Sequence, residues 1–182
     1  MTNNIVFIYI LEYLGGINSF LTERTFDIKV VEVYSSRPDL ISFADWKVER
    51  ISRGVFGLSG KYTVNTTILE GDSNEIEVLI YRSYNGVRDF RPLPLNMERK
   101  HIYDYMNVFY KMYVMNSIRT CSTMPVFEGR FKPPLEKKTY VLEKCQVKVD
   151  DYPLLLEGFY KFAVIGYGEA DWSMNFTGQM DG

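Results

Sequence analysis

The side chains that could do acid–base or metal chemistry are few in this sequence. There is one histidine, His101, and there are two cysteines, Cys121 and Cys145. A site that needs two histidines is therefore excluded, and a structural zinc site of cysteines and histidines lacks its fourth ligand. His101 lies beside Lys100 and Asp104 on a predicted helix, which favours a surface or half-buried position over a catalytic one. No G-x-S-x-G turn positions a serine nucleophile, so we expect no enzyme activity, no cofactor and no metal.

The clustered charges indicate exposed surface rather than a reactive site. Glu75 and Glu77 alternate with apolar residues as on a solvated strand face, and Asp150 and Asp151 are typical of a turn rather than of a glycosidase dyad. The lysine pair at 137–138 is too small a patch for a membrane or a nucleic acid, although it could contact an anionic headgroup. The net charge is −2 over 182 residues. We therefore expect no nucleic-acid partner.

The composition predicts a mainly β chain. Hydrophobic residues make up 46%, charged residues 24% and aromatic residues 15%, which is typical of a globular domain that removes roughly 70% of its unfolded surface from water. Alanine is rare, whereas valine, isoleucine, threonine and aromatic residues are frequent, and this favours strands over helices. No repeat or linker divides the chain, so we expect a single domain over residues 20–182.

The N-terminus favours secretion. Residues 5–11 form an apolar run that is too short to span a bilayer, which takes about 20 residues. Cleavage near 16–19 would fit a signal peptide over residues 1–19, and we then expect an extracellular protein with no stable membrane insertion. No Lys or Arg precedes the run, so a buried first strand is the alternative. N-glycosylation sequons at Asn65 and Asn175 are consistent with secretion.

Period-two alternation predicts strands at 27–34, 45–51, 61–69, 75–81, 139–149, 158–165 and 172–176. The turn at 70–74 is predicted to join two of them as a hairpin, and residues 166–168 to join the last two. Within 139–149 the alternation changes phase at 143–144, where we expect a β-bulge. Asn65 and Asn175 fall on the polar phase of their strands, where a glycan could point to water.

One amphipathic helix is predicted in the middle of the chain. Ile102, Met106, Phe109 and Tyr113 recur at helical spacing, and Asn96 is the expected N-cap. The predicted architecture is therefore a strand meander with one helix between the fourth strand and the last three.

The C-terminal half resembles a known superfamily. A cysteine and a proline precede a strand with an early tyrosine, and a second proline then precedes a Gly-x-Tyr-basic stretch that opens the next strand. The positions that carry this pattern are Cys121, Pro125, Tyr140, Pro153, Gly158, Tyr160 and Lys161. The pattern is similar to that of the ganglioside-activator and lipid-recognition superfamily, and more closely to its insect branch of CheB-like secreted proteins. The resemblance extends from about Phe26 to the C-terminus.

The resemblance implies an immunoglobulin-like β-sandwich or cup whose sheets separate to admit a lipid or another small hydrophobic ligand. It implies a secreted, non-enzymatic binding protein, with insect chemosensation as a suggested role and the receptor unidentified. The chain lacks the cysteines usual for such proteins in the first strand and on the helix. The alternative is therefore a secreted interaction protein with a closed core and no small-molecule ligand. Cys121 and Cys145 would close a loop of about 24 residues, but their spacing does not decide whether they pair.

The large residues on the inward phase are the candidates for contact with such a ligand, although ordinary core packing is the commoner role for each. They are Trp46, Tyr62, Val64, Ile76, Ile80, Phe109, Tyr160, Phe162, Trp172 and Phe176.

Overall fold

The computed structural model describes residues 25–68, 72–86, 88–149 and 155–180. Most of these residues form strands, and one helical segment stands in the middle of the chain. The predicted mainly β fold with a single helix is therefore confirmed. The signal peptide expected over residues 1–19 lies outside the described residues.

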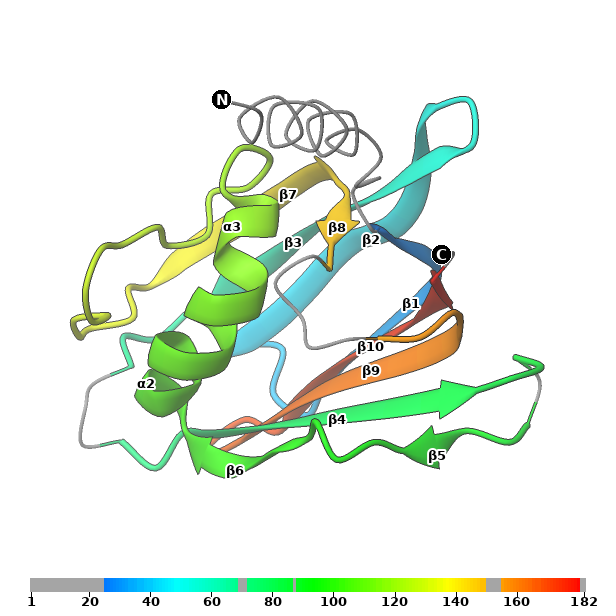
Figure 1. The fold of residues 1–182 in the computed structure, drawn as a ribbon. Helices are drawn as coiled ribbons and strands as arrows, with labels where there is room; N and C mark the ends of the chain where they lie inside the picture. Colours follow the sequence, from blue (N-terminus) through cyan, green and yellow to red (C-terminus); the bar gives the residue numbers. More distant parts are fainter. Residues whose placement is uncertain (1–24, 69–71, 87, 150–154, 181–182) are drawn as a thin grey trace, which may run out of the picture.

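Two curled sheets form the fold (Figure 1). The larger sheet has the order β5-β4-β9-β10-β1-β8, and β6 also pairs with β4. Its strands are β1 (Thr25–Ser35), β4 (Glu75–Ser83), β5 (Arg91–Pro92), β6 (Met97–His101), β8 (Val147–Lys148), β9 (Gly158–Tyr167) and β10 (Trp172–Met180). The smaller sheet has the order β2-β3-β7, with β2 (Ile41–Ser52), β3 (Val55–Val64) and β7 (Lys138–Cys145).

The inner face of the larger sheet follows the predicted alternation. Ile76, Val78 and Ile80 of β4 are buried, and Val78 and Ile80 stand opposite Val164 and Phe162 of β9. Burying these apolar faces stabilises the sheet, because each fully buried side chain of this size contributes roughly 1.5–3 kcal/mol. The last two strands, β9 and β10, form the predicted antiparallel hairpin. Its connection lies slightly later than expected because β9 continues to Tyr167.

The predicted hairpin between the strands at 61–69 and 75–81 is wrong. β3 pairs with β2 and β7 in the smaller sheet, whereas β4 belongs to the larger one, so the chain crosses between sheets after Val64. Ile68 does not continue β3 and instead forms an isolated bridge to Leu135. Alternation predicts which face of a strand is buried, but it does not say which strand lies beside it.

The predicted β-bulge at 143–144 is confirmed. Leu142 stands opposite Gly60 and Cys145 opposite Leu58, so two residues of β7 face the single residue Ser59. The backbone N–H of Lys144 donates to Ser59 Oγ at 2.8 Å. The extra residue turns Cys145 inward, where its side chain is almost fully buried. From this position Cys145 forms a disulfide with Cys121.

The predicted N-cap of the helix is wrong. The residues after Asn96 form β6, which pairs with β4, and the Asn96 side-chain oxygen accepts a hydrogen bond from the backbone N–H of Ile80 at 2.7 Å. The helical segment begins five residues later, at Ile102, with His101 as its N-cap. His101 Nδ1 accepts from the backbone N–H of Tyr103 at 3.3 Å. The residues that were expected to begin the helix therefore form a strand that pairs with β4.

The middle of the helical segment has an unusual winding. Its parts are α2 (Ile102–Tyr105), the π-helix η1 (Met106–Val114) and α3 (Met115–Ile118). The backbone N–H of Met115 bonds the carbonyl of Tyr110, five residues back, as π-winding requires. α2 contacts β4 and β6, and α3 contacts β7 and β8. Figure 1 shows the segment lying across the opening between the two sheets, where it covers the interior described next.

Candidate functional site

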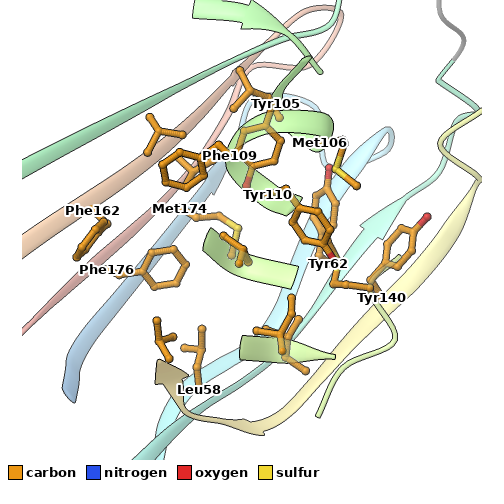
Figure 2. Close-up of a pocket in the computed structure, with 18 of the residues that line it drawn as sticks. Leu58, Tyr62, Tyr105, Met106, Phe109, Tyr110, Tyr140, Phe162, Met174 and Phe176 are labelled. Atoms are coloured by element: carbon orange, nitrogen blue, oxygen red, sulfur yellow. The ribbon is translucent and has the colours of Figure 1, made fainter. Parts of the chain in front are cut away.

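An apolar cavity of about 190 Å³ lies inside the curl of the two sheets. Both sheets and the helical segment contribute to its wall, and Figure 2 shows Tyr105 and Phe109 of the helix facing the same space as Met174 and Phe176 of β10. Among the described residues that line the cavity, none carries a charge. Its volume is of the same order as the roughly 150 Å³ of an engineered apolar cavity that stays dry and binds benzene.

The helical wall of the cavity follows the π-winding. Tyr105, Phe109, Tyr110 and Val114 line it, so the positions recur four or five residues apart, as expected where hydrogen bonds join residues five apart. The predicted face is correct at Ile102, Met106 and Phe109. It is wrong at Tyr113, which is absent from the lining and packs edge-on against Phe109 at 5.2 Å between ring centroids. Because a π-helix has more residues per turn than an α-helix, Val114 rather than Tyr113 lines the cavity.

The sequence contains two tryptophans, and both line the cavity. The Trp46 indole lies over Gly60 and the Trp172 indole over Gly166, which stands opposite it on β9. A Cβ added at Gly60 would lie 2.4 Å from the Trp46 ring, and one at Gly166 would lie 2.1 Å from the Trp172 ring. Each glycine therefore permits an aromatic ring to lie close against a strand backbone.

Most of the predicted ligand-contact residues are brought together in this wall. The residues that line the cavity are Trp46, Tyr62, Ile76, Phe109, Phe162, Trp172 and Phe176. The structure places Val64, Ile80 and Tyr160 in the packed core outside the lining, each at most 1% exposed. The hydroxyl of Tyr160 donates to the carbonyl of Leu156 at 2.5 Å, which holds this ring away from the cavity. The inward side of a strand includes residues that line the cavity and residues in the packed core, so the alternation of the sequence could not distinguish the two.

Sequence reasoning missed several residues of the wall. Val78, Val164 and Met174 lie on the inward phase of predicted strands and could have been found from it. Met124 and Leu135 also line the cavity, but they belong to the irregular chain between α3 and β7, where no periodicity marks an inward position.

Four tyrosines bring their rings to the cavity, and their hydroxyls differ in what they bond. Tyr110 donates to the carbonyl of Pro125 at 2.6 Å, and Tyr140 to the carbonyl of Glu136 at 3.2 Å. Within the part of the chain that the structure describes, the hydroxyls of Tyr62 and Tyr105 have no hydrogen-bond partner. Burial raises the pKa of Tyr62, Tyr105 and Tyr110 above 10.0, and the neighbouring Tyr140 and Tyr105 raise that of Tyr62 further.

These buried phenols predict a loss of stability at alkaline pH. A tyrosine whose pKa is raised by folding contributes stability that is complete below the unfolded pKa of about 10 and is lost as pH rises toward the folded pKa. We expect the free energy of unfolding to fall by up to about 1.4 kcal/mol per pH unit for each such tyrosine above pH 10. Denaturant unfolding at a series of alkaline pH values, with tyrosinate absorbance, measures this.

The control for this prediction is the triple variant Tyr62→Phe, Tyr105→Phe, Tyr110→Phe, which removes the three groups and leaves the lysines that also titrate at high pH. We expect its stability to depend less steeply on pH than that of the native chain. Equal slopes for the two proteins would contradict the prediction.

The remaining candidates for chemistry have structural positions. His101 caps the helix and its ring stacks on that of Tyr103 at 5.2 Å between centroids. No group of three or more His, Cys, Asp or Glu side chains that could hold a metal occurs among the described residues. The same part of the chain contains no helix that is long and apolar enough to cross a membrane. Cys121 and Cys145 are joined as a disulfide and are not available as nucleophiles.

The two sequon asparagines are in different settings. Asn65 directly follows β3, and its side-chain nitrogen donates to the carbonyl of Asp39 at 2.9 Å. Asn175 is half-buried in the middle of β10, between Glu32 of β1 and Ala163 of β9. It lies on the opposite phase from the lining residues Met174 and Phe176, so a glycan there would project away from the cavity. Glycosylation at both sites stays a prediction.

One comparison with known families gives a match. Residues 76–162 match the model of a family described as "Protein of unknown function (DUF1091)". No curated protein matches the chain. The matched segment begins in β4, includes the helical segment, the disulfide and β7, and ends in β9. The chain is thus similar to that family over the helical wall of the cavity and over lining residues of β4, β7, β8 and β9.

Proposed function

We propose that this protein is a secreted, non-enzymatic carrier that holds a small hydrophobic molecule, such as a lipid chain, in the cavity between the helical segment and the two sheets. The observation that carries the proposal is the cavity itself, with about 190 Å³ of space behind a wall without charged side chains. Water is a poor occupant of such a space, because a buried water needs two to four polar partners. An apolar chain is a better occupant because it needs none.

The expected affinity follows from the area that a ligand would bury. Each buried CH₂ contributes about 0.8 kcal/mol, so a ten-carbon chain supplies roughly 8 kcal/mol before losses. Association and ordering then reduce this gain. We therefore expect dissociation constants of about 10 μM or weaker for simple aliphatic ligands. The size of the cavity favours a single slim chain over a bulky ligand.

Two further observations support secretion. The Cys121–Cys145 disulfide is of a kind that persists in oxidising compartments. The sequon residues Asn65 and Asn175 are both half-buried rather than fully enclosed, and Asn175 is on the face of its strand opposite the cavity. The motif similar to insect CheB-like proteins lies mostly within residues 76–162, and it supports assignment to the lipid-recognition superfamily and a role in insect chemosensation. A partner receptor is part of that proposed role.

The cavity tryptophans provide the experiment. Trp46 and Trp172 are the tryptophans of the chain and both line the cavity, so an occupant changes their emission directly. Protein secreted from insect cells would be analysed by native mass spectrometry for a bound lipid. After delipidation it would be titrated with N-phenylnaphthylamine, and this probe then displaced with decanol. We expect saturable energy transfer from tryptophan to the probe, reversed by decanol at roughly tens of micromolar.

A closed-core interaction protein gives a different result. It would show neither a co-purified lipid nor saturable, displaceable emission, and that outcome would overturn the carrier proposal.

A further inference from the structure

Two phenols in the cavity wall differ from the other buried tyrosines in what their hydroxyls bond. Four other tyrosines, of which Tyr110 and Tyr140 also line the cavity, donate to a backbone carbonyl: Tyr103 to Ile68 at 2.6 Å, Tyr110 to Pro125 at 2.6 Å, Tyr140 to Glu136 at 3.2 Å and Tyr160 to Leu156 at 2.5 Å. Tyr62 and Tyr105 have no such bond within the described residues. Unlike the other four, these two hydroxyls therefore keep their hydrogen-bonding capacity free.

The two unpaired hydroxyls reach the cavity from different elements. Tyr62 comes from β3 and Tyr105 from α2, and both line the cavity (Figure 2). Tyr62 is only 9% exposed, and the pKa of its hydroxyl is raised mainly by burial and further by the neighbouring Tyr140 and Tyr105.

The wall has two further donors, the indole N–H groups of Trp46 and Trp172. Trp46 Nε1 donates to the carbonyl of Lys61 at 2.8 Å, whereas Trp172 Nε1 has no hydrogen-bond partner among the described residues. The free donors of the wall are therefore the hydroxyls of Tyr62 and Tyr105 and the indole N–H of Trp172, whose ring lies 5.8 Å from that of Tyr62 between centroids.

The wall also limits the charge of an occupant. No Lys, Arg or His is among the described residues that line the cavity. An ionised carboxylate would therefore be buried without a counter-ion, which is strongly unfavourable. A pure hydrocarbon would fill the space but would leave both hydroxyls unpaired. A neutral oxygen acceptor satisfies the hydroxyls without bringing in a charge.

We propose that the cavity selects uncharged single-chain lipids that carry one oxygen acceptor, such as an ester, ketone, aldehyde or alcohol, held by hydrogen bonds from Tyr62 and Tyr105. This inference rests on the proposed carrier function and specifies its ligand class. The apolar wall binds the chain, and the two phenols fix its polar end.

The test compares four ten-carbon probes of different polarity: decane, decanol, methyl decanoate and sodium decanoate at a pH where the acid is ionised. Each would displace N-phenylnaphthylamine from the native chain, from Tyr62→Phe, from Tyr105→Phe and from the double variant. In the native chain we expect methyl decanoate and decanol to bind about five- to tenfold more tightly than decane, which corresponds to one net hydrogen bond. Decanoate should bind more weakly than methyl decanoate.

The double variant should abolish the preference for methyl decanoate over decane while it retains the affinity for decane. Tyr160→Phe is the matched control, because it removes a phenol that is outside the lining and already bonded; it should leave the preference unchanged. Melting temperatures give a second readout: Tyr62→Phe and Tyr105→Phe lose no hydrogen bond and should melt no lower than the native chain, whereas Tyr160→Phe should melt lower.

The possible failures can be told apart. A preference for methyl decanoate that persists in the double variant, or equal binding of all four probes by the native chain, would overturn this inference and leave the carrier function standing. Tighter binding of decanoate than of its methyl ester would also overturn it. If no probe binds any of the proteins, the carrier function and this inference both fail.

Discussion

Removing the disulfide is expected to lower the free energy of unfolding by about 3 kcal/mol, because a cross-link closing a loop of this length restricts the unfolded chain by that amount. Cys121 and Cys145 are 24 residues apart in the sequence. The bond joins the chain just after α3 to the inner side of β7, so it also holds the end of the helical wall against the smaller sheet. Denaturant unfolding of the native chain and of the variant Cys121→Ala, Cys145→Ala measures the difference.

The control is the native chain unfolded in a reductant, which breaks the cross-link without removing a side-chain atom. Reduced native chain and double variant should agree to within about 1 kcal/mol, since the alanines remove little buried volume. A double variant as stable as the oxidised native chain would contradict the prediction. The hydrogen bond from the backbone N–H of Glu143 to the carbonyl of Cys121, at 2.8 Å, stays available in all three proteins and preserves part of the same contact.

Filling the cavity with a ring is expected to abolish binding. Val164 lies on the inner face of β9, opposite Val78 and Met174, and all three line the cavity. In Val164→Phe the larger side chain would occupy the space proposed for the ligand. We expect the affinity for decanol to fall at least tenfold, roughly 1.4 kcal/mol or more. The free energy of unfolding should change by less than about 1.5 kcal/mol, because the added carbon atoms enter existing space rather than a filled core.

The neighbouring residue supplies the matched control. Ile165 follows Val164 on β9 and is on the opposite face of the sheet, so Ile165→Phe adds a ring outside the cavity. It should leave decanol binding unchanged. Two results would contradict the prediction: retained affinity in Val164→Phe, or a loss of stability of several kcal/mol, which is typical of overpacking in a filled interior. The second result would favour the closed-core alternative.

Local patterning predicted the strands and the bulge but not their assembly. The bulge at 143–144 can be predicted because its extra residue shifts the alternation of apolar and polar side chains along the strand, and this shift is visible in the sequence. The partner of β3 leaves no such trace. The turn residues before β4 therefore predict a hairpin, whereas the chain crosses to the other sheet. The pairing of Cys121 and Cys145 was likewise open, because it depends on the bulge turning Cys145 inward against the chain that follows α3.

The candidate site was predictable where burial follows a simple period. Phe162, Trp172 and Phe176 are inward residues of strands and do line the cavity. Ile80 also points inward from its strand, but it lies where the core is closely packed. The alternation of a strand shows which side chains point inward, and it does not show how far apart the facing layers are. Tyr105 was missed although it lies three residues after Ile102 and four before Phe109, on the edge of the predicted face, because that face was limited to the four residues at 102, 106, 109 and 113. The π-winding that follows places Tyr110, five residues after Tyr105, on the same wall.

Because Met106–Val114 is a π-helix, the shape of the cavity depends on the spacing of the helical backbone hydrogen bonds as well as on the types of the lining residues. A one-residue deletion in an exposed position of this segment, such as Val108, would restore ordinary α geometry and rotate every later side chain by about a quarter of a turn. Tyr110 and Val114 would then leave the wall together. A single inserted or deleted codon in this segment would thus reshape the interior of the protein while leaving the residues of the strands unchanged.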